Sequence, residues 1–111
     1  MDEATLFQLL KTTSLPVAYH HFVSPPTPPY VVYYEAEAEA RGCDEKNRIR
    51  DSGWIVEVYT VKKQPDIQKL VESLLDERGI EWRMTFSGLI ESEGLYMAAY
   101  TFGTTRKIRR N

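Results

Sequence analysis

Residues 54–61 of this 111-residue chain read Trp-Ile-Val-Glu-Val-Tyr-Thr-Val, a run dense in β-branched and aromatic residues. Such side chains fit the pleated surface of a sheet, so the run predicts a strand. Pro65 and Asp66 then open a helical pattern, and Gly79 supplies a left-handed stop after it. The apolar residues of this pattern are Ile67, Leu70, Val71, Leu74 and Leu75. Burying five such side chains contributes roughly 8–15 kcal/mol, comparable to the net stability of a domain, so we expect this helix to lie on the sheet.

Two further strands are predicted on the C-terminal side of this helix. Residues 80–86 alternate between apolar and polar side chains, as a half-buried strand does. The alternation turns four residues inward: Ile80, Trp82, Met84 and Phe86. Residues 95–102, Leu-Tyr-Met-Ala-Ala-Tyr-Thr-Phe, predict the last strand of the chain.

The N-terminal part of the chain predicts a helix and a strand. In residues 2–12 the apolar side chains cluster on one side of a helical wheel, which predicts a short opening helix. Residues 30–40 begin Tyr-Val-Val-Tyr-Tyr and continue with glutamates that alternate with alanines. This period of two favours a strand with its glutamates on one face, although Ala and Glu are also good helix formers. We expect the strand to leave the sheet for solvent near residue 37.

Three segments separate these elements. Residues 17–22 are expected to form a brief extended piece, and residues 24–29, Ser-Pro-Pro-Thr-Pro-Pro, form a stiff proline-rich arm that cannot join the interior of a sheet. Residues 41–53 are mostly charged and bounded by glycines, which predicts a long surface loop that contacts a partner. Residues 1–105 thus predict one α+β domain, a mainly antiparallel sheet of about four strands with helices packed on one face. Residues 106–111 form a basic C-terminal tail.

The composition excludes several classes of protein. With 42% apolar and 27% charged residues, the chain has the make-up of one soluble domain. It has neither an apolar run of membrane-spanning length nor the charged and apolar start of a signal peptide, so we expect it to be cytosolic when made. Its single cysteine, Cys43, excludes a disulfide framework and a multi-cysteine zinc site. A net charge of -2 provides no global field to gather nucleic acid.

Candidate catalytic and metal-ligating residues are few. His20 and His21 are neighbours, and neighbours on an extended chain point to opposite sides, so they are not expected to chelate one metal. Cys43 lies beside Asp44 and Glu45, whose carboxylates discourage a reactive thiolate. The alternating glutamates could clamp a cation or a basic partner, but an exposed strand face is the simpler interpretation. The sequence therefore predicts no enzyme, no metal site and no cofactor.

Three groups of residues are candidate contact surfaces. Tyr30, Tyr33 and Tyr34 bring more aromatic surface to one strand than a small core is expected to cover, which predicts burial against another subunit. The charged loop supplies Asp44, Glu45, Lys46, Arg48, Arg50 and Asp51. The basic tail supplies Arg106, Lys107, Arg109 and Arg110. These four positive charges would contact DNA phosphates or an acidic protein surface.

Four segments of the chain together carry a resemblance to a known family. They are residues 15–22 (Leu-Pro-Val-Ala-Tyr to Phe), 28–33 (Pro-Pro-Tyr-Val-Val-Tyr), 54–60 (Trp-Ile-Val-Glu-Val-Tyr-Thr) and 90–96 (Ile-Glu-Ser-Glu-Gly-Leu-Tyr). In this order they resemble the small tail-completion and head-tail joining proteins of long-tailed bacteriophages and of their prophages in Gram-positive bacteria. Residues 35–53 depart most from that pattern, because only Gly-Cys-Asp at 42–44 stands near the turn that such proteins place after the first strand.

The resemblance implies a tail-terminator-like fold and assembly into a ring, expected to be a hexamer, in the virion where the tail tube meets the capsid connector. The implied partners are further copies of the chain, the tail-tube protein and the connector proteins, with DNA passing transiently through the lumen and no membrane involved. Assembly would take place in the cytoplasm of the bacterial host. A face of glutamates would suit a lumen that must not retain DNA. The alternative function is a small nucleic-acid-binding accessory protein that uses the basic tail, and steep salt dependence of DNA affinity would favour it.

Overall fold

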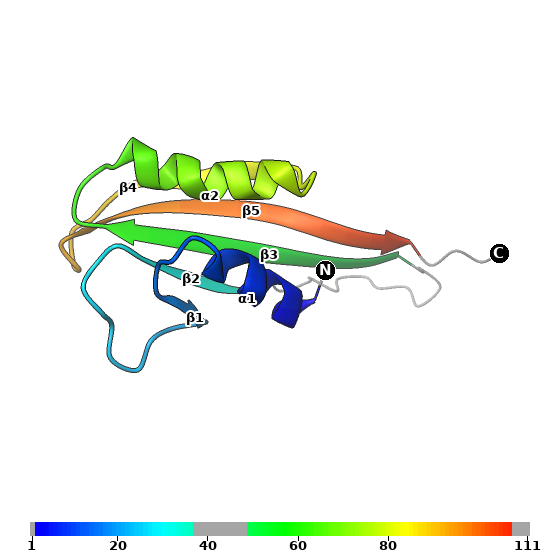
Figure 1. Cartoon of the computed structure of the whole chain (residues 1–111), viewed down its shortest axis with the longest axis horizontal. Coiled ribbons are helices and arrows are strands. Elements are labelled where there is room, and N and C mark those ends of the chain that lie inside the picture. The colour runs from blue at the N-terminus through cyan, green and yellow to red at the C-terminus, as the bar shows by residue number, and fades with distance from the viewer. Residues whose placement is uncertain (1, 37–48, 108–111) are drawn as a thin grey trace.

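The computed structural model describes residues 2–36 and 49–107, with side chains described at residues 2–36 and 53–103 (Figure 1). In chain order its elements are α1 (Glu3–Lys11), β1 (Val17–Tyr19), β2 (Tyr30–Ala36), β3 (Ile49–Thr60), α2 (Pro65–Glu77), β4 (Trp82–Ile90) and β5 (Leu95–Lys107). The strands form one sheet in the order β1-β2-β3-β5-β4. β1 runs parallel to β2 and the other neighbours are antiparallel, so the sheet is mixed.

The predicted α+β class is confirmed, but the described part of the sheet has five strands rather than about four. The additional strand is β1, in which Val17, Ala18 and Tyr19 pair with residues 31–33 of β2. Three residues are too few to show a period of two, and a parallel pairing depends on a distant segment of the chain. The sequence therefore indicated an extended piece here without showing that it joins the sheet.

Both helices pack on the same face of the sheet, which we call the helix face (Figure 1). The strands contribute alternate residues to this core: Val31 and Tyr33 of β2, Trp54, Val56 and Val58 of β3, and Ala98, Tyr100 and Phe102 of β5. The helices contribute Leu6, Leu9, Leu10, Val71 and Leu75. Because the side chains of a strand point alternately to its two sides, the residues between these lie on the opposite face.

Two buried tyrosines fasten the helices to the sheet. The Tyr33 hydroxyl donates a 2.8 Å hydrogen bond to Glu3 of α1, and the Tyr100 hydroxyl donates a 2.7 Å hydrogen bond to Glu72 of α2. Burial, and then these hydrogen bonds to carboxylates, raise the pKa of both phenols above the ordinary value. Each ring thus fills the core while its polar end is satisfied at the edge of a helix.

The helix predicted from residues 65–79 lies on the sheet, but its buried stripe is narrower than expected. Val71 and Leu75 are fully buried, and Ile67 and Leu74 pack at the margin of the core. Leu70 is 41% exposed, so the prediction that it is buried is wrong. The five apolar residues span a wider part of the helix surface than the sheet covers, so Leu70 stays exposed at its margin.

The strand predicted at residues 80–86 is shifted and its inward face is only partly correct. β4 begins at Trp82, and Ile80 packs against the core from the turn before it. Met84 and Phe86 are 39% and 42% exposed rather than buried. A shift of register between these two residues marks a β-bulge at Thr85, which breaks the alternation.

β3 and β5 continue past their neighbours as a two-stranded ribbon, formed by residues 49–52 and 104–107 (Figure 1). The last described pair between β2 and β3 is Ala36 with Gly53, and the first between β4 and β5 is Trp82 with Phe102. In the part of the chain that the structure describes, no strand pairs with the outer edges of the ribbon.

The ribbon corrects the predicted limits of the charged loop and the basic tail. Residues 49–53 belong to β3 instead of a loop, and Arg106 and Lys107 belong to β5 instead of a tail. These strands pair through backbone hydrogen bonds, which form whether the side chains are apolar or charged. A charged sequence can therefore form a strand here. Residues 37–48 and 108–111, which hold the remainder of the predicted loop and tail, lie outside the described residues.

Candidate interaction surfaces

The sheet face opposite the two helices, which we call the open face, is mainly apolar and aromatic. Its members on β2, β3 and β5 are Tyr30, Val32, Tyr34, Ile55, Glu57, Tyr59, Leu95, Met97, Ala99 and Thr101. A sheet face that meets only water normally alternates with polar residues. Glu57 is the one charged member of this set, and β4 adds the charged Arg83 at the margin beside Phe86 and Ile90, so the centre of the face has the composition of a surface that another body covers.

Glu57 is held in a fixed orientation by two tyrosines. Its carboxylate accepts a 2.7 Å hydrogen bond from the Tyr34 hydroxyl on one oxygen and a 2.8 Å hydrogen bond from the Tyr59 hydroxyl on the other. Burial and the hydrogen bond to Glu57 raise the pKa of Tyr34 to about 12 and raise the pKa of Tyr59 above its usual range. Both phenols therefore remain donors to Glu57 to a higher pH than an ordinary tyrosine would.

A pocket of about 140 Å³ opens beside this carboxylate. Its wall on the sheet consists of Tyr30, Val32, Glu57 and Tyr59, and the loop after β1 adds His20, His21, Phe22 and Pro25. Glu93, from the turn between β4 and β5, completes the lining. The Tyr30 and Tyr59 rings stack at 5.1 Å, and Phe22 meets Tyr30 edge-on at 5.3 Å. The result is an aromatic pocket with two carboxylates, which we call the acidic pocket.

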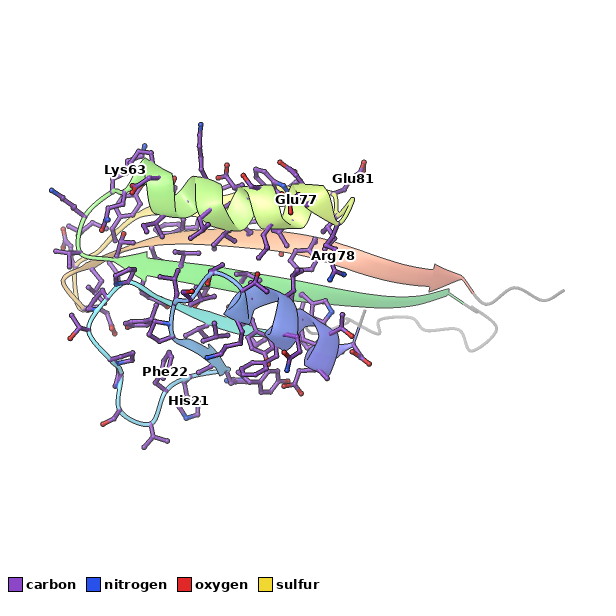
Figure 2. The ribbon with its side chains drawn as sticks, viewed as in Figure 1. His21, Phe22, Lys63, Glu77, Arg78 and Glu81 are labelled. Atoms are coloured by element: carbon purple, nitrogen blue, oxygen red, sulfur yellow. The ribbon has the colours of Figure 1, made fainter. Side chains whose placement is uncertain are left out.

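The two histidines do not point to opposite sides as predicted. His20 has a φ of 73°, so the chain turns after β1 and both imidazoles line the acidic pocket, with ring centroids 6.0 Å apart. Figure 2 shows His21 on the loop between β1 and β2, away from α2. Within residues 2–36 and 49–107, no three His, Cys, Asp or Glu side chains come together as a metal site would require.

The outer edge of β4 carries exposed apolar residues. Met84, Phe86 and Leu89 are 39%, 42% and 58% exposed. The bulge places Phe86 opposite Ala99, on the open face, and its ring lies over Gly88. In the described structure β4 pairs only with β5, so the other side of its backbone is unpaired. Such an edge is able to pair with another chain.

The tyrosines predicted as contact residues have separate positions. Tyr30 and Tyr33 are only 6% and 1% exposed, so the expectation that another subunit must cover them is not met. Tyr33 fills the helix face beneath α1, and Phe22 and Tyr59 enclose Tyr30. Tyr34 is on the open face and half-buried. Sequence spacing could not show that α1, Phe22 and Tyr59 supply this cover.

The charged residues predicted as contacts are only partly described. The backbone at Arg50, Asp51, Arg106 and Lys107 lies in the ribbon. The others, Asp44, Glu45, Lys46, Arg48, Arg109 and Arg110, lie outside the described residues. None of the contact residues predicted from the sequence was Glu57, Phe86 or Glu93. For Glu57 a signal existed, because it is the single charged residue within the apolar run 54–61.

Comparison with known proteins shows the fold alone. No known family matches the sequence, and no curated protein matches it. One solved structure, whose name describes no function, is similar with a TM-score of 0.53 and 14% sequence identity. The match covers 100% of this chain and 99% of that one, so the whole α+β arrangement is shared. Neither described helix has the length and hydropathy needed to cross a bilayer.

Proposed function

We propose that this protein is a non-enzymatic structural component of a long-tailed phage or prophage. It forms a ring that completes the tail tube and joins it to the capsid connector. The proposal rests on the four sequence segments that resemble tail-completion and head-tail joining proteins, together with surfaces suited to self-association. Its place is the neck of the virion, and its assembly takes place in the host cytoplasm.

The observation that carries the proposal is the exposed edge at β4. The strand reads Trp-Arg-Met-Thr-Phe-Ser-Gly-Leu-Ile, with one charged residue and no proline, and it exposes Met84, Phe86 and Leu89. Sheet edges that remain in water are usually protected by charges, by proline, by a β-bulge or by being short, and of these devices β4 has one arginine and the bulge at Thr85. The edge at β1 is only three residues long, so the two edges differ and favour a head-to-tail contact. Repeated head-to-tail contacts close into a ring when the rotation between copies permits.

The test is the mass of the full chain in solution, measured by light scattering alone and with the tail-tube protein. We expect a ring in at least one of these conditions. Phe86→Ser should weaken each contact about ten-fold and so lower the assembled fraction, because burying half of a phenylalanine side chain contributes roughly 1–1.5 kcal/mol at each contact. Val23→Ser is the matched control, since Val23 is 96% exposed and lies in the loop between β1 and β2. A wild-type chain that stays monomeric with the tube protein present refutes the proposal.

A second candidate function is nucleic-acid binding by the ribbon. The observation that favours it is the register of β3 and β5, which pairs Arg50 with Arg106 and Ile49 with Lys107 and so gathers three basic residues at one end of the sheet. Neutralised phosphates release counterions, so this function predicts a DNA affinity that falls steeply with salt. Self-association that tolerates salt, without such DNA binding, favours the ring.

A further inference from the structure

We propose that the acidic pocket on the open face binds a basic side chain from the ribbon of an adjacent copy of this chain. The pocket is thus the receiving half of a head-to-tail contact, and the ribbon is the inserting half. This inference rests on the proposed self-association and adds a second contact to the one proposed at the β4 edge.

The chemistry of the pocket suits a guanidinium or ammonium group. Glu57 and Glu93 bring two carboxylates to a space walled by the rings of Phe22, Tyr30 and Tyr59, and no lysine or arginine is among its lining residues. Aromatic faces attract cations, and carboxylates form charge-assisted hydrogen bonds with them. The negative charge of Glu93 acts within the pocket, because it contributes to the raised pKa of Tyr30 and of Tyr59.

Glu57 retains capacity to accept a further hydrogen bond. Tyr34 and Tyr59 each donate to a different oxygen of the carboxylate. Each carboxylate oxygen has two lone pairs, so one on each oxygen is left over. The tyrosine hydroxyls also fix the carboxylate before any ligand arrives, which reduces the entropy lost on binding.

The size of the pocket favours a side chain over a cofactor. Pockets for small molecules and cofactors generally enclose about 300–1,000 Å³. This one has about 140 Å³ and is partly open to solvent. One long side chain, presented by a strand or a loop, is the class of ligand that fits.

The ribbon carries the complementary charge at the other end of the molecule. Its residues include Arg50, Arg106 and Lys107 against a single carboxylate, that of Asp51. Figure 1 shows this end of β3 and β5 extending away from the turn between β4 and β5, where Glu93 lies. The ribbon is therefore a basic end of the sheet, whereas the opposite end carries Glu91 and Glu93 together with Lys62 and Lys63.

A ribbon cannot reach the pocket of its own chain. Arg50 and Glu57 lie seven residues apart on β3, which corresponds to roughly 23 Å along an extended strand. Because β5 pairs with β3 over this entire length, the strand cannot fold back on itself. Insertion must therefore come from a second copy, and each insertion leaves that copy's own pocket free for the next, as a ring requires.

The test measures binding of a fluorescent peptide with the sequence of residues 101–107, Thr-Phe-Gly-Thr-Thr-Arg-Lys, by anisotropy. The receiving protein is the full chain carrying R50Q, R106Q and K107Q, so that its own ribbons do not compete. We expect saturable binding that Glu57→Gln weakens about ten-fold through loss of a charge-assisted hydrogen bond. Glu93→Gln should also weaken binding. Because Glu93 lies in an exposed turn, this variant should fold normally, and it tests the pocket even if the Glu57 variant folds poorly. Glu91→Gln, in the same turn but outside the pocket lining, should leave the affinity unchanged.

The outcomes separate this inference from the proposed function. A peptide that does not bind, or that binds equally well to the Glu57 and Glu93 variants, overturns the inference even if the wild-type chain forms a ring. Peptide binding to a wild-type chain that remains monomeric with the tube protein overturns the proposed function, and with it the adjacent copy as the donor. Pocket-dependent binding together with a ring that Glu93→Gln weakens supports both.

Discussion

The hydrogen bond between Tyr100 and Glu72 is expected to make a measurable contribution to the stability of the fold. Tyr100 is fully buried at the centre of the helix face, and its hydroxyl donates to Glu72 at 2.7 Å. Tyr100→Phe keeps the ring, and hence the packing, and removes only the donor. The perturbation therefore isolates the contact that ties α2 to β5.

The magnitude follows from the environment of the acceptor. A hydrogen bond to a charged group contributes about 1.5–3 kcal/mol when its partner is left unsatisfied in the interior. Glu72 is only partly buried, so water can replace the lost donor and we expect about 1.5 kcal/mol, the lower end of that range. For a chain of this size such a loss lowers the melting temperature by roughly 6 °C.

The assay is urea unfolding at neutral pH of the wild type, Tyr100→Phe, Glu72→Ala and the double variant. The double-mutant cycle should give a coupling energy of about 1 kcal/mol between the two side chains. Tyr96→Phe is the control, because the Tyr96 hydroxyl, on the same strand, meets Ser87 at an exposed site. If Tyr100→Phe loses no more stability than Tyr96→Phe, or if the coupling energy is zero, the hydrogen bond does not stabilise the fold.

Two further predictions concern pH and backbone conformation. The fold should lose stability above pH 10, because burial raises the pKa of Tyr34 to about 12 from 10.0 and also raises that of Tyr33 and Tyr100. Above pH 10 the tyrosines of the unfolded chain lose their protons before those of the folded chain do. The stability that the protonated tyrosines contribute is therefore complete below pH 10 and is lost as the pH rises toward their pKa values in the folded state. A urea midpoint that stays constant between about pH 8 and about pH 11 contradicts this prediction. Gly79→Ala should cost about 1 kcal/mol, because Gly79 has a φ of +71° while nothing lies within 4 Å of the added carbon. Gly103→Ala, which meets no neighbour within 4 Å and needs no positive φ, is its control in thermal unfolding, and equal losses would exclude the backbone explanation.

The limits of the sequence analysis are clearest at three places. The bulge at Thr85 turns Phe86 toward the open face. The alternating pattern of residues 80–86 contains no signal that would predict the position of this bulge. The charged residues of the ribbon have the composition of a loop, yet they pair because β3 and β5 extend the same ladder. The acidic pocket combines the loop after β1, the open face and the turn at Glu93, which are far apart in the chain.

Local elements could be predicted from the residues alone: the strand within residues 54–61, the helix that ends before Gly79, the last strand from Leu95, and the α+β class they compose. These follow from propensity and from periods of two and 3.6, which depend on neighbouring residues only. Only the tertiary structure decided that β1 joins the sheet, that Tyr30 and Tyr33 are covered within the chain, and that Glu57 and Glu93 share a pocket. The physical reason is that burial and side-chain proximity depend on which distant segments pack together, and a one-dimensional pattern contains no distances between them.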